Sequence, residues 1–136
     1  LARRGWQVTG VDFAPRAIRT ARRKAAAAGL HITFHTADVS DLRMLTGPYE
    51  YVLDIGCLFA LGQEARTRYA KGLSRLTRAG ATYMLYAWLP RPWQGRIWGL
   101  STEEVEALIG ERFTLVRQVV GQEKGHPSAW YWYRRR

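Results

Sequence analysis

The sequence predicts an α/β protein built on a mostly parallel sheet that closes with an antiparallel pair of strands. β-prone and helical segments alternate over the first hundred residues, and strands joined through helices run parallel. The last two β-prone segments, 113–120 and 129–133, have no helix between them, so we expect them to pair antiparallel. The chain has 136 residues and 47% hydrophobic residues, which is enough for one core, and we expect 1–136 to form a single domain.

Three strands and one helix are expected in the first half. Residues 7–11 form a short β-prone run followed by Asp12, and Pro15 suits the first turn of a helix. Residues 16–28 carry apolar side chains at helical spacing, and Gly29 is a typical cap at the helix C-terminus. The next strands are expected at 31–36 and 49–55. The apolar run of the second is nearly continuous, as in a strand covered on both faces.

The second half begins with a helix predicted over 63–77, which Ala79 and Gly80 separate from a strand over 81–88. A loop rich in proline and tryptophan follows over 89–99. Ser101 and Glu104 have the spacing of a capping box, which starts a helix that runs to about Ile109. Because ligands of parallel sheets bind at the carboxyl ends of the strands, functional residues should directly follow strands.

The composition excludes several classes of protein. Cys57 is the only cysteine, so the chain holds no internal disulfide and no multi-cysteine zinc site, and we expect no metal. No apolar run is long enough to span a membrane and no signal peptide is visible, so we expect a cytoplasmic location. The net charge of +10 is compatible with nucleic-acid binding, but 18 of the 21 basic residues are arginine, a bias that GC-rich coding sequence also produces.

Two acids follow neighbouring strands of the predicted sheet. Asp12 ends the first strand, where a carboxylate can accept hydrogen bonds from both hydroxyls of a ribose. Asp38 follows the second strand, where a carboxylate can accept from the adenine amine while the Val39 N–H donates to a ring nitrogen. Taken singly, Asp12 is also explained as a helix cap and Asp38 as a turn residue. Together, the two acids indicate an adenosine site.

Several segments resemble motifs of class I S-adenosylmethionine-dependent methyltransferases. Residues 4–18 resemble the motif whose acid binds ribose, and residues 37–42 the motif that binds adenine. Residues 49–57 resemble the fourth motif, and 76–81 the turn before the fifth strand. The closing segment 127–131 is similar to small-molecule members such as the tellurite-resistance and thiopurine methyltransferases. The resemblance covers nearly the whole chain through the order and spacing of its motifs.

The resemblance implies a Rossmann-like methyltransferase sheet, S-adenosylmethionine as cofactor and methyl transfer to a small molecule. In this family the fourth motif faces the methionine part of the cofactor. The residues that it implies for cofactor binding are Asp12, Phe13, Asp38, Val39, Asp54, Gly56 and Cys57. Cys57 is otherwise explained as a small apolar filler of the core.

The Gly-rich first motif of the family is not found. Residues 52–57 resemble it, but the bulky Leu58 and Phe59 follow where the close approach of a cofactor requires small residues. The ribose motif would also precede the first motif instead of following it. We therefore expect the central first strand to be missing from this chain. The missing part would have been removed, left out of this sequence or supplied by a second chain.

The expected substrate pocket lies after the strand at 81–88, where aromatic side chains gather. Its candidate residues are Phe59, Trp88, Trp93 and Trp98. Such a wall suits an apolar or aromatic small molecule. No catalytic base stands out: His31 and His35 lie on a strand, His126 lies in a loop, and the Asn/Asp-Pro-Pro-Tyr signature of the amino-methylating members of the family is absent.

Three other interpretations stay open. The basic charge and the terminal residues 134–136 are compatible with a nucleic-acid methyltransferase. An NAD-linked dehydrogenase shares the ribose acid but leaves Asp38 and the antiparallel closing pair unexplained. A non-catalytic remnant of the fold would expose unpaired strand edges, and we would then expect self-association or a partner chain.

Overall fold

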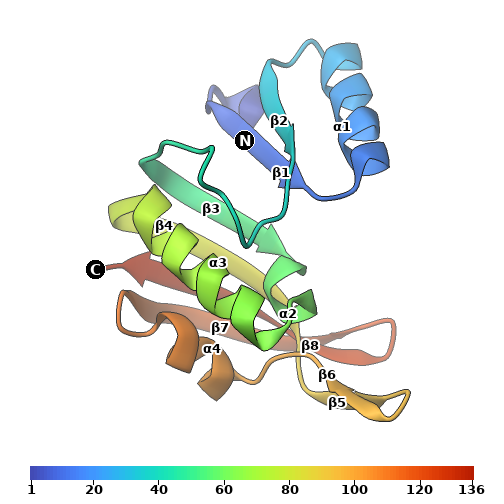
Figure 1. Ribbon diagram of the computed structural model, residues 1–136, viewed down its shortest axis with the longest axis vertical. Coiled ribbons are helices and arrows are strands. Elements are labelled where there is room, and N and C mark those ends of the chain that lie inside the picture. The colour runs from blue at the N-terminus through green and yellow to red at the C-terminus, as the bar shows by residue number, and fades with distance from the viewer. The chain divides into compact units, whose positions relative to one another are not determined.

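The computed structural model describes residues 1–136, which fold as two compact units, residues 1–42 and 43–136. The first unit contains a short 3-10 helix η1 (Ala2–Arg4), the strands β1 (Val8–Asp12) and β2 (Ile32–Thr36), and the helix α1 (Pro15–Ala27) (Figure 1). Each unit has its own sheet. The expectation of one domain over 1–136 stays a prediction.

The first unit is a β-α-β element, as the sequence predicts. β1 and β2 are parallel, with Val8 opposite Ile32 and Asp12 opposite Thr36. α1 connects them and buries Ile18 and Ala25. The crossover through a helix is what brings the carboxyl ends of both strands to one edge of the sheet.

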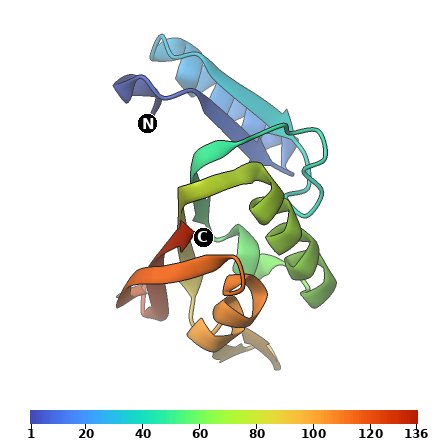
Figure 2. The same cartoon turned by 90° about the vertical axis from the view of Figure 1, so that its left-hand side faces the viewer.

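The second unit is a four-stranded sheet in the order β3-β4-β8-β7, with α3 and α4 on one face (Figures 1 and 2). β3 and β4 are parallel, whereas β4 pairs antiparallel with β8, and β8 with β7. The parallel pairs β1–β2 and β3–β4, which are both connected through helices, and the antiparallel strands β7 and β8 confirm the α/β class with an antiparallel closing pair. The elements of this unit are β3 (Tyr49–Ile55), α2 (Cys57–Ala60), α3 (Gln63–Leu76), β4 (Thr77–Trp88), β5 (Arg91–Trp93), β6 (Arg96–Trp98), α4 (Thr102–Ile109), β7 (Phe113–Glu123) and β8 (His126–Arg135).

The core of the second unit lies between the sheet and the two helices. Tyr83, Tyr131 and Tyr133 alternate with outward residues along β4 and β8, and each is at most 1% exposed. α4 begins with the predicted capping box: the Glu104 N–H donates to the Ser101 side chain, and the Ser101 N–H donates back to the Glu104 carboxylate. No helix is both long and apolar enough to cross a membrane.

Two elements depart from the sequence prediction. β4 starts at Thr77 directly after α3 and contains Gly80, because the chain enters the sheet through a bulge instead of a separating turn. The expected loop over 89–99 forms a hairpin of β5 and β6 around Gln94 and Gly95, which both have positive φ. Strands of three residues are too short for a periodic pattern.

Gly99 fixes the base of this hairpin. A Cβ at Gly99 would lie 2.5 Å from the carbonyl oxygen of Leu89, and φ is +104° there. We expect Gly99→Ala to destabilise the second unit by about 2 kcal/mol, because both the backbone strain and the collision must be relieved. Chemical denaturation measures the change. Gly125→Ala, at a positive φ with no atom within 4 Å of the added Cβ, is the control and should cost clearly less.

Candidate functional site

The Asp12 carboxylate lies where β1 ends. Its Oδ1 accepts the Ala14 N–H at 2.8 Å, and the backbone carbonyl of Asp12 accepts the Ala37 N–H at 3.0 Å. These bonds fix the side chain at the turn into α1, as an Asx turn does. Oδ2 has no partner within the chain, so one carboxylate oxygen is free for a ligand.

The Asp38 carboxylate repeats this geometry after β2. Its Oδ1 accepts the Ser40 N–H at 2.7 Å, and the backbone carbonyl of Asp38 accepts the Asp41 N–H at 2.9 Å. Its Oδ2 and the Val39 N–H have no partner within the chain. A free acceptor therefore lies next to a free donor, which is the pair that the amine edge of adenine requires.

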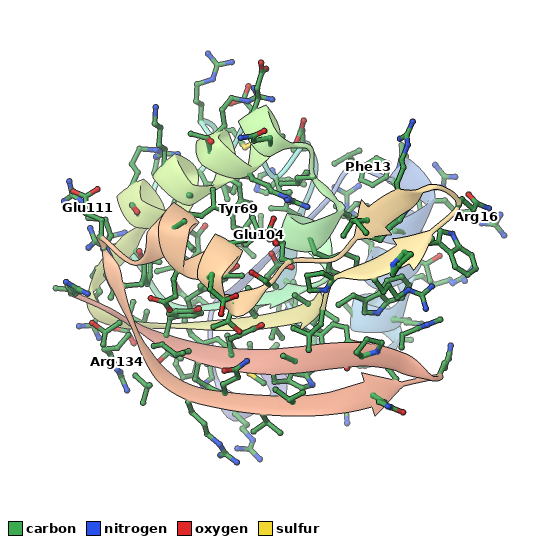
Figure 3. The ribbon with its side chains drawn as sticks, turned by 90° about the horizontal axis from the view of Figure 1, so that it is seen from below. Phe13, Arg16, Tyr69, Glu104, Glu111 and Arg134 are labelled. Carbon is green, nitrogen blue, oxygen red and sulfur yellow. The ribbon has the colours of Figure 1, made fainter.

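The two acids belong to one edge of the β1–β2 sheet. Asp12 is the register partner of Thr36, two residues before Asp38, and adjacent strands lie about 4.8 Å apart. Phe13, labelled in Figure 3, follows Asp12 and is 80% exposed, which makes its ring available for stacking. An open hollow elsewhere in this unit, lined by Gln7, Arg22 and Phe34 among others, contains none of the predicted site residues.

The Asp54 side chain is buried in the second unit and is 3% exposed. Its Oδ1 accepts the Cys57 N–H at 2.6 Å, and its Oδ2 accepts the Leu58 N–H at 3.1 Å and the Tyr69 hydroxyl at 2.8 Å. Figure 3 shows Tyr69 on α3. Both oxygens are thus used to hold the turn from β3 into α2. Asp54 therefore holds the turn that carries Gly56 and Cys57, and its role in cofactor binding stays a prediction.

Burial raises the pKa of the Asp54 carboxyl above its ordinary value, and the donated hydrogen bonds offset only part of that effect. The pKa of the Tyr69 hydroxyl is raised well above its ordinary value, first by burial and then by the nearby Tyr83 and Asp54. Tyr69 therefore acts as a neutral donor to Asp54. Because the Tyr69 hydroxyl keeps its proton at neutral pH, its hydrogen bond to Asp54 persists there.

The raised pKa of Asp54 predicts a pH dependence of stability. Above the unfolded-state value of 3.8, the folded protein keeps a proton that the unfolded chain releases. This contribution is complete below that value and is lost as the pH rises through the folded-state pKa. We expect the free energy of unfolding of wild type, relative to Asp54→Asn, to fall as the pH rises from about 4 toward neutrality. Denaturation of both proteins across this range checks the trend, and parallel curves would contradict it.

Gly56 and Cys57 form the tip that Asp54 holds. Gly56 has φ of +90°, and a Cβ there would lie 3.0 Å from the Phe59 ring, so glycine suits both the turn and the close approach. Cys57 is a partly buried cysteine at the start of α2 and forms no disulfide. No group of acids, histidines and cysteine in the chain could hold a metal ion.

A cluster of aromatic side chains around one arginine lies at the carboxyl end of β4. We call Phe59, Trp88, Arg91, Trp93 and His126 the aromatic–arginine cluster. Phe59 stacks on Trp88 with ring centroids 5.3 Å apart, and His126 lies 5.1 Å from Trp88 and 6.5 Å from Trp93. The Arg91 guanidinium lies 5.4 Å from the Trp88 ring and 4.8 Å from the Trp93 ring.

The structure thus brings three of the four predicted pocket residues into one cluster. Trp98 is the register partner of Arg91 on the β5–β6 hairpin, but it has no ring contact with the others. The sequence pattern does not single out Arg91, because it is one of 18 arginines, and it does not indicate whether His126 has a functional role. Only the fold shows that the β5–β6 hairpin lies beside the turn between β7 and β8 (Figure 1).

Acids at the tips of adjacent parallel strands are typical of α/β proteins that bind nucleotides. The family model described as a methyltransferase domain matches residues 1–80. The chain belongs to this family, the class I S-adenosylmethionine-dependent methyltransferases. This membership confirms the resemblance seen in the sequence, the Rossmann-like fold and S-adenosylmethionine as cofactor. The finer likeness to the tellurite-resistance and thiopurine group, and the absence of a first strand, stay predictions.

Individual relatives agree with the family. An uncharacterized methyltransferase of Schizosaccharomyces pombe is 30% identical over 101 residues, which are 70% of this chain and 70% of that protein. The 2-heptyl-1-hydroxyquinolin-4(1H)-one methyltransferase of Mycobacteroides abscessus is 34% identical over 86 residues, 62% of this chain and 38% of that protein. The N-methyltransferase NodS of Bradyrhizobium japonicum WM9, solved with S-adenosyl-L-homocysteine, matches with a TM-score of 0.81 at 19% identity, over 95% of this chain and 66% of NodS.

Proposed function

We propose that this protein catalyses methyl transfer from S-adenosylmethionine to a small-molecule acceptor. The observation that carries the cofactor part is the pair of strand-tip acids, each with one oxygen bound to its own turn and one oxygen free. The bound cofactor would supply an activated methyl group on a sulfonium, so the protein has mainly to position the reactants. This division of work is compatible with the lack of an evident catalytic base.

Within the first unit, each residue has a distinct task. Asp12 accepts hydrogen bonds from the ribose hydroxyls, and the exposed Phe13 ring covers a face of the adenine. Asp38 accepts from the adenine amine, and the Val39 N–H donates to a ring nitrogen. The residues present therefore fit an adenosine. In the second unit, we assign Gly56 and Cys57 to the methionine part, with Asp54 holding their turn.

Asp38 should recognise the amine of the adenine. We expect Asp38→Ala to weaken binding of S-adenosylhomocysteine about tenfold, because one charge-assisted hydrogen bond to the amine is lost. S-inosylhomocysteine lacks that amine, so the same substitution should change its binding far less. Calorimetric titration of both ligands against wild type and Asp38→Ala gives the comparison. An equal loss for the two ligands would contradict the assignment.

The small-molecule part of the proposal is supported by the aromatic–arginine cluster at the carboxyl end of β4, where parallel sheets bind ligands. The 2-heptyl-1-hydroxyquinolin-4(1H)-one methyltransferase, a relative of this chain, is named for an aromatic heterocycle. A nucleic-acid acceptor is the second candidate, favoured by the net charge of +10. Steep salt dependence of RNA or DNA binding would support it.

The proposed function is tested by titrating the protein with S-adenosylhomocysteine in a calorimeter. Binding in about the micromolar range, near −8 kcal/mol, is expected for a functional cofactor site. A folded protein that releases no heat with this ligand would be the non-catalytic member of the family considered above.

A further inference from the structure

The Arg91 guanidinium lacks a counter-ion. Its Nη1 contacts His126 Nδ1, but its Nε is buried without a hydrogen-bond partner, and no carboxylate forms an ion pair with Arg91. A buried donor without an acceptor is costly, so the unpartnered Nε of this half-buried arginine calls for an acceptor. The planar fork of a guanidinium binds carboxylates and related oxyanions in two-point contacts. The unpaired Arg91 therefore points to an anionic ligand.

His126 lies beside Arg91, where its Nδ1 contacts the Arg91 Nη1. An imidazole adds no negative charge there, so this contact does not supply a counter-ion. The nearest acid across the β7–β8 pair is Glu123, whose carboxylate accepts from the Tyr86 hydroxyl. Glu123 therefore binds Tyr86 and forms no ion pair with Arg91.

The rings of the cluster favour a flat ligand. Trp88 and Phe59 stack at an interplanar angle of 21°, while Trp93 is 48% exposed and carries Arg91 over its ring. Tryptophan and phenylalanine faces bind planar aromatic groups, and tryptophan also holds the cation in place. An oxyanion without a ring would contact Arg91 but would leave the exposed part of Trp93 uncovered. An aromatic oxyanion uses both.

We propose that the aromatic–arginine cluster binds the methyl acceptor and that this acceptor is a planar aromatic compound carrying an oxyanion, such as an aromatic carboxylate or a phenolate. This inference rests on the proposed methyl transfer. A carboxylate, or a phenol acidic enough to ionise near neutral pH, arrives already deprotonated: its oxygen lone pair forms the new bond to the methyl carbon, and the electron pair of the broken carbon–sulfur bond stays on sulfur. No proton has to move, which agrees with the lack of a base.

The test measures direct binding of 2-naphthoate, which is flat and anionic, in the presence of S-adenosylhomocysteine. Two comparison ligands each lack one feature: 2-naphthamide has no charge, and cyclohexanecarboxylate has no aromatic ring. We expect 2-naphthoate to bind about tenfold more tightly than either. Equal affinities for 2-naphthoate and 2-naphthamide would overturn the anionic part of the proposal.

Arg91→Gln should weaken 2-naphthoate binding about tenfold or more, because the charged fork is lost. Arg96→Gln removes the same charge from the same hairpin, where Arg96 is exposed, and should stay within about twofold of wild type. Arg91→Lys keeps the charge without the fork and should fall between them, which guards against a hairpin that fails to form in Arg91→Gln. Equal effects of Arg91→Gln and Arg96→Gln would overturn the assignment.

S-adenosylhomocysteine affinity separates this inference from the proposed function. We expect it to be unchanged in Arg91→Gln. If that substitution weakens S-adenosylhomocysteine as much as 2-naphthoate, Arg91 binds the carboxylate of the cofactor and the inference is wrong. Binding of 2-naphthoate by a protein that does not bind S-adenosylhomocysteine would support the anion site and contradict the proposed methyl transfer.

Discussion

Asp12→Ala should weaken binding of S-adenosylhomocysteine about one-hundredfold. A carboxylate that accepts from both ribose hydroxyls makes two charge-assisted hydrogen bonds, and their loss costs about 3 kcal/mol together. The same substitution removes the Oδ1 acceptor of the Ala14 N–H. Calorimetric titration of wild type and Asp12→Ala measures the loss of affinity.

Asp12→Asn separates the two consequences. The amide oxygen can still accept the Ala14 N–H, so the turn into α1 should persist, but the carboxylate charge is gone. We expect a loss of about tenfold, between wild type and Asp12→Ala. Glu111→Ala removes an equal charge from an exposed position and should leave the affinity unchanged. If Asp12→Asn and Glu111→Ala gave the same affinity as wild type, the assignment of Asp12 to the ribose would be wrong.

Asp54→Ala should destabilise the second unit by about 3 kcal/mol. The substitution leaves the N–H groups of Cys57 and Leu58 without their acceptor, and each buried donor left in this way costs about 1–3 kcal/mol. The Tyr69 hydroxyl loses Asp54 but keeps its contact with the Tyr83 hydroxyl at 3.2 Å. Chemical denaturation of wild type and variant measures the difference.

Tyr69→Phe is the matched control for Asp54→Ala. It removes one donor to Asp54 and leaves both backbone N–H groups bound, so we expect a smaller loss of about 1 kcal/mol. Glu50→Ala removes an exposed acid that pairs with Arg78 at 2.8 Å and should cost less still. A loss for Asp54→Ala no larger than that for Glu50→Ala would show that Asp54 does not hold the turn.

Local signals allowed the sequence to predict much of this molecule. The capping box of Ser101 and Glu104 depends on two residues three positions apart, and the structure contains both of its hydrogen bonds. Asp12 is the last residue of β1 and Asp38 comes two residues after the end of β2, so recognising the two strands was enough to predict that both acids lie at one edge of the sheet.

What the sequence did not reveal depends on contacts between distant segments. The Asp54 carboxylate accepts a hydrogen bond from Tyr69, 15 positions later in the chain. Nothing in the pattern of either segment indicates that this carboxylate is turned inward. Arg91 meets His126 only because the β5–β6 hairpin lies beside the β7–β8 turn. The four residues of α2 are also too few for helical periodicity.

NMR titration with S-adenosylhomocysteine tests directly whether one adenosine contacts the tips of both β1 and β2. We expect the backbone amide signals of Phe13 and Val39 to shift together, with one dissociation constant, although the two residues are 26 positions apart. A ligand that shifts only one of these signals, or neither while it binds elsewhere, would show that no adenosine lies across the two tips.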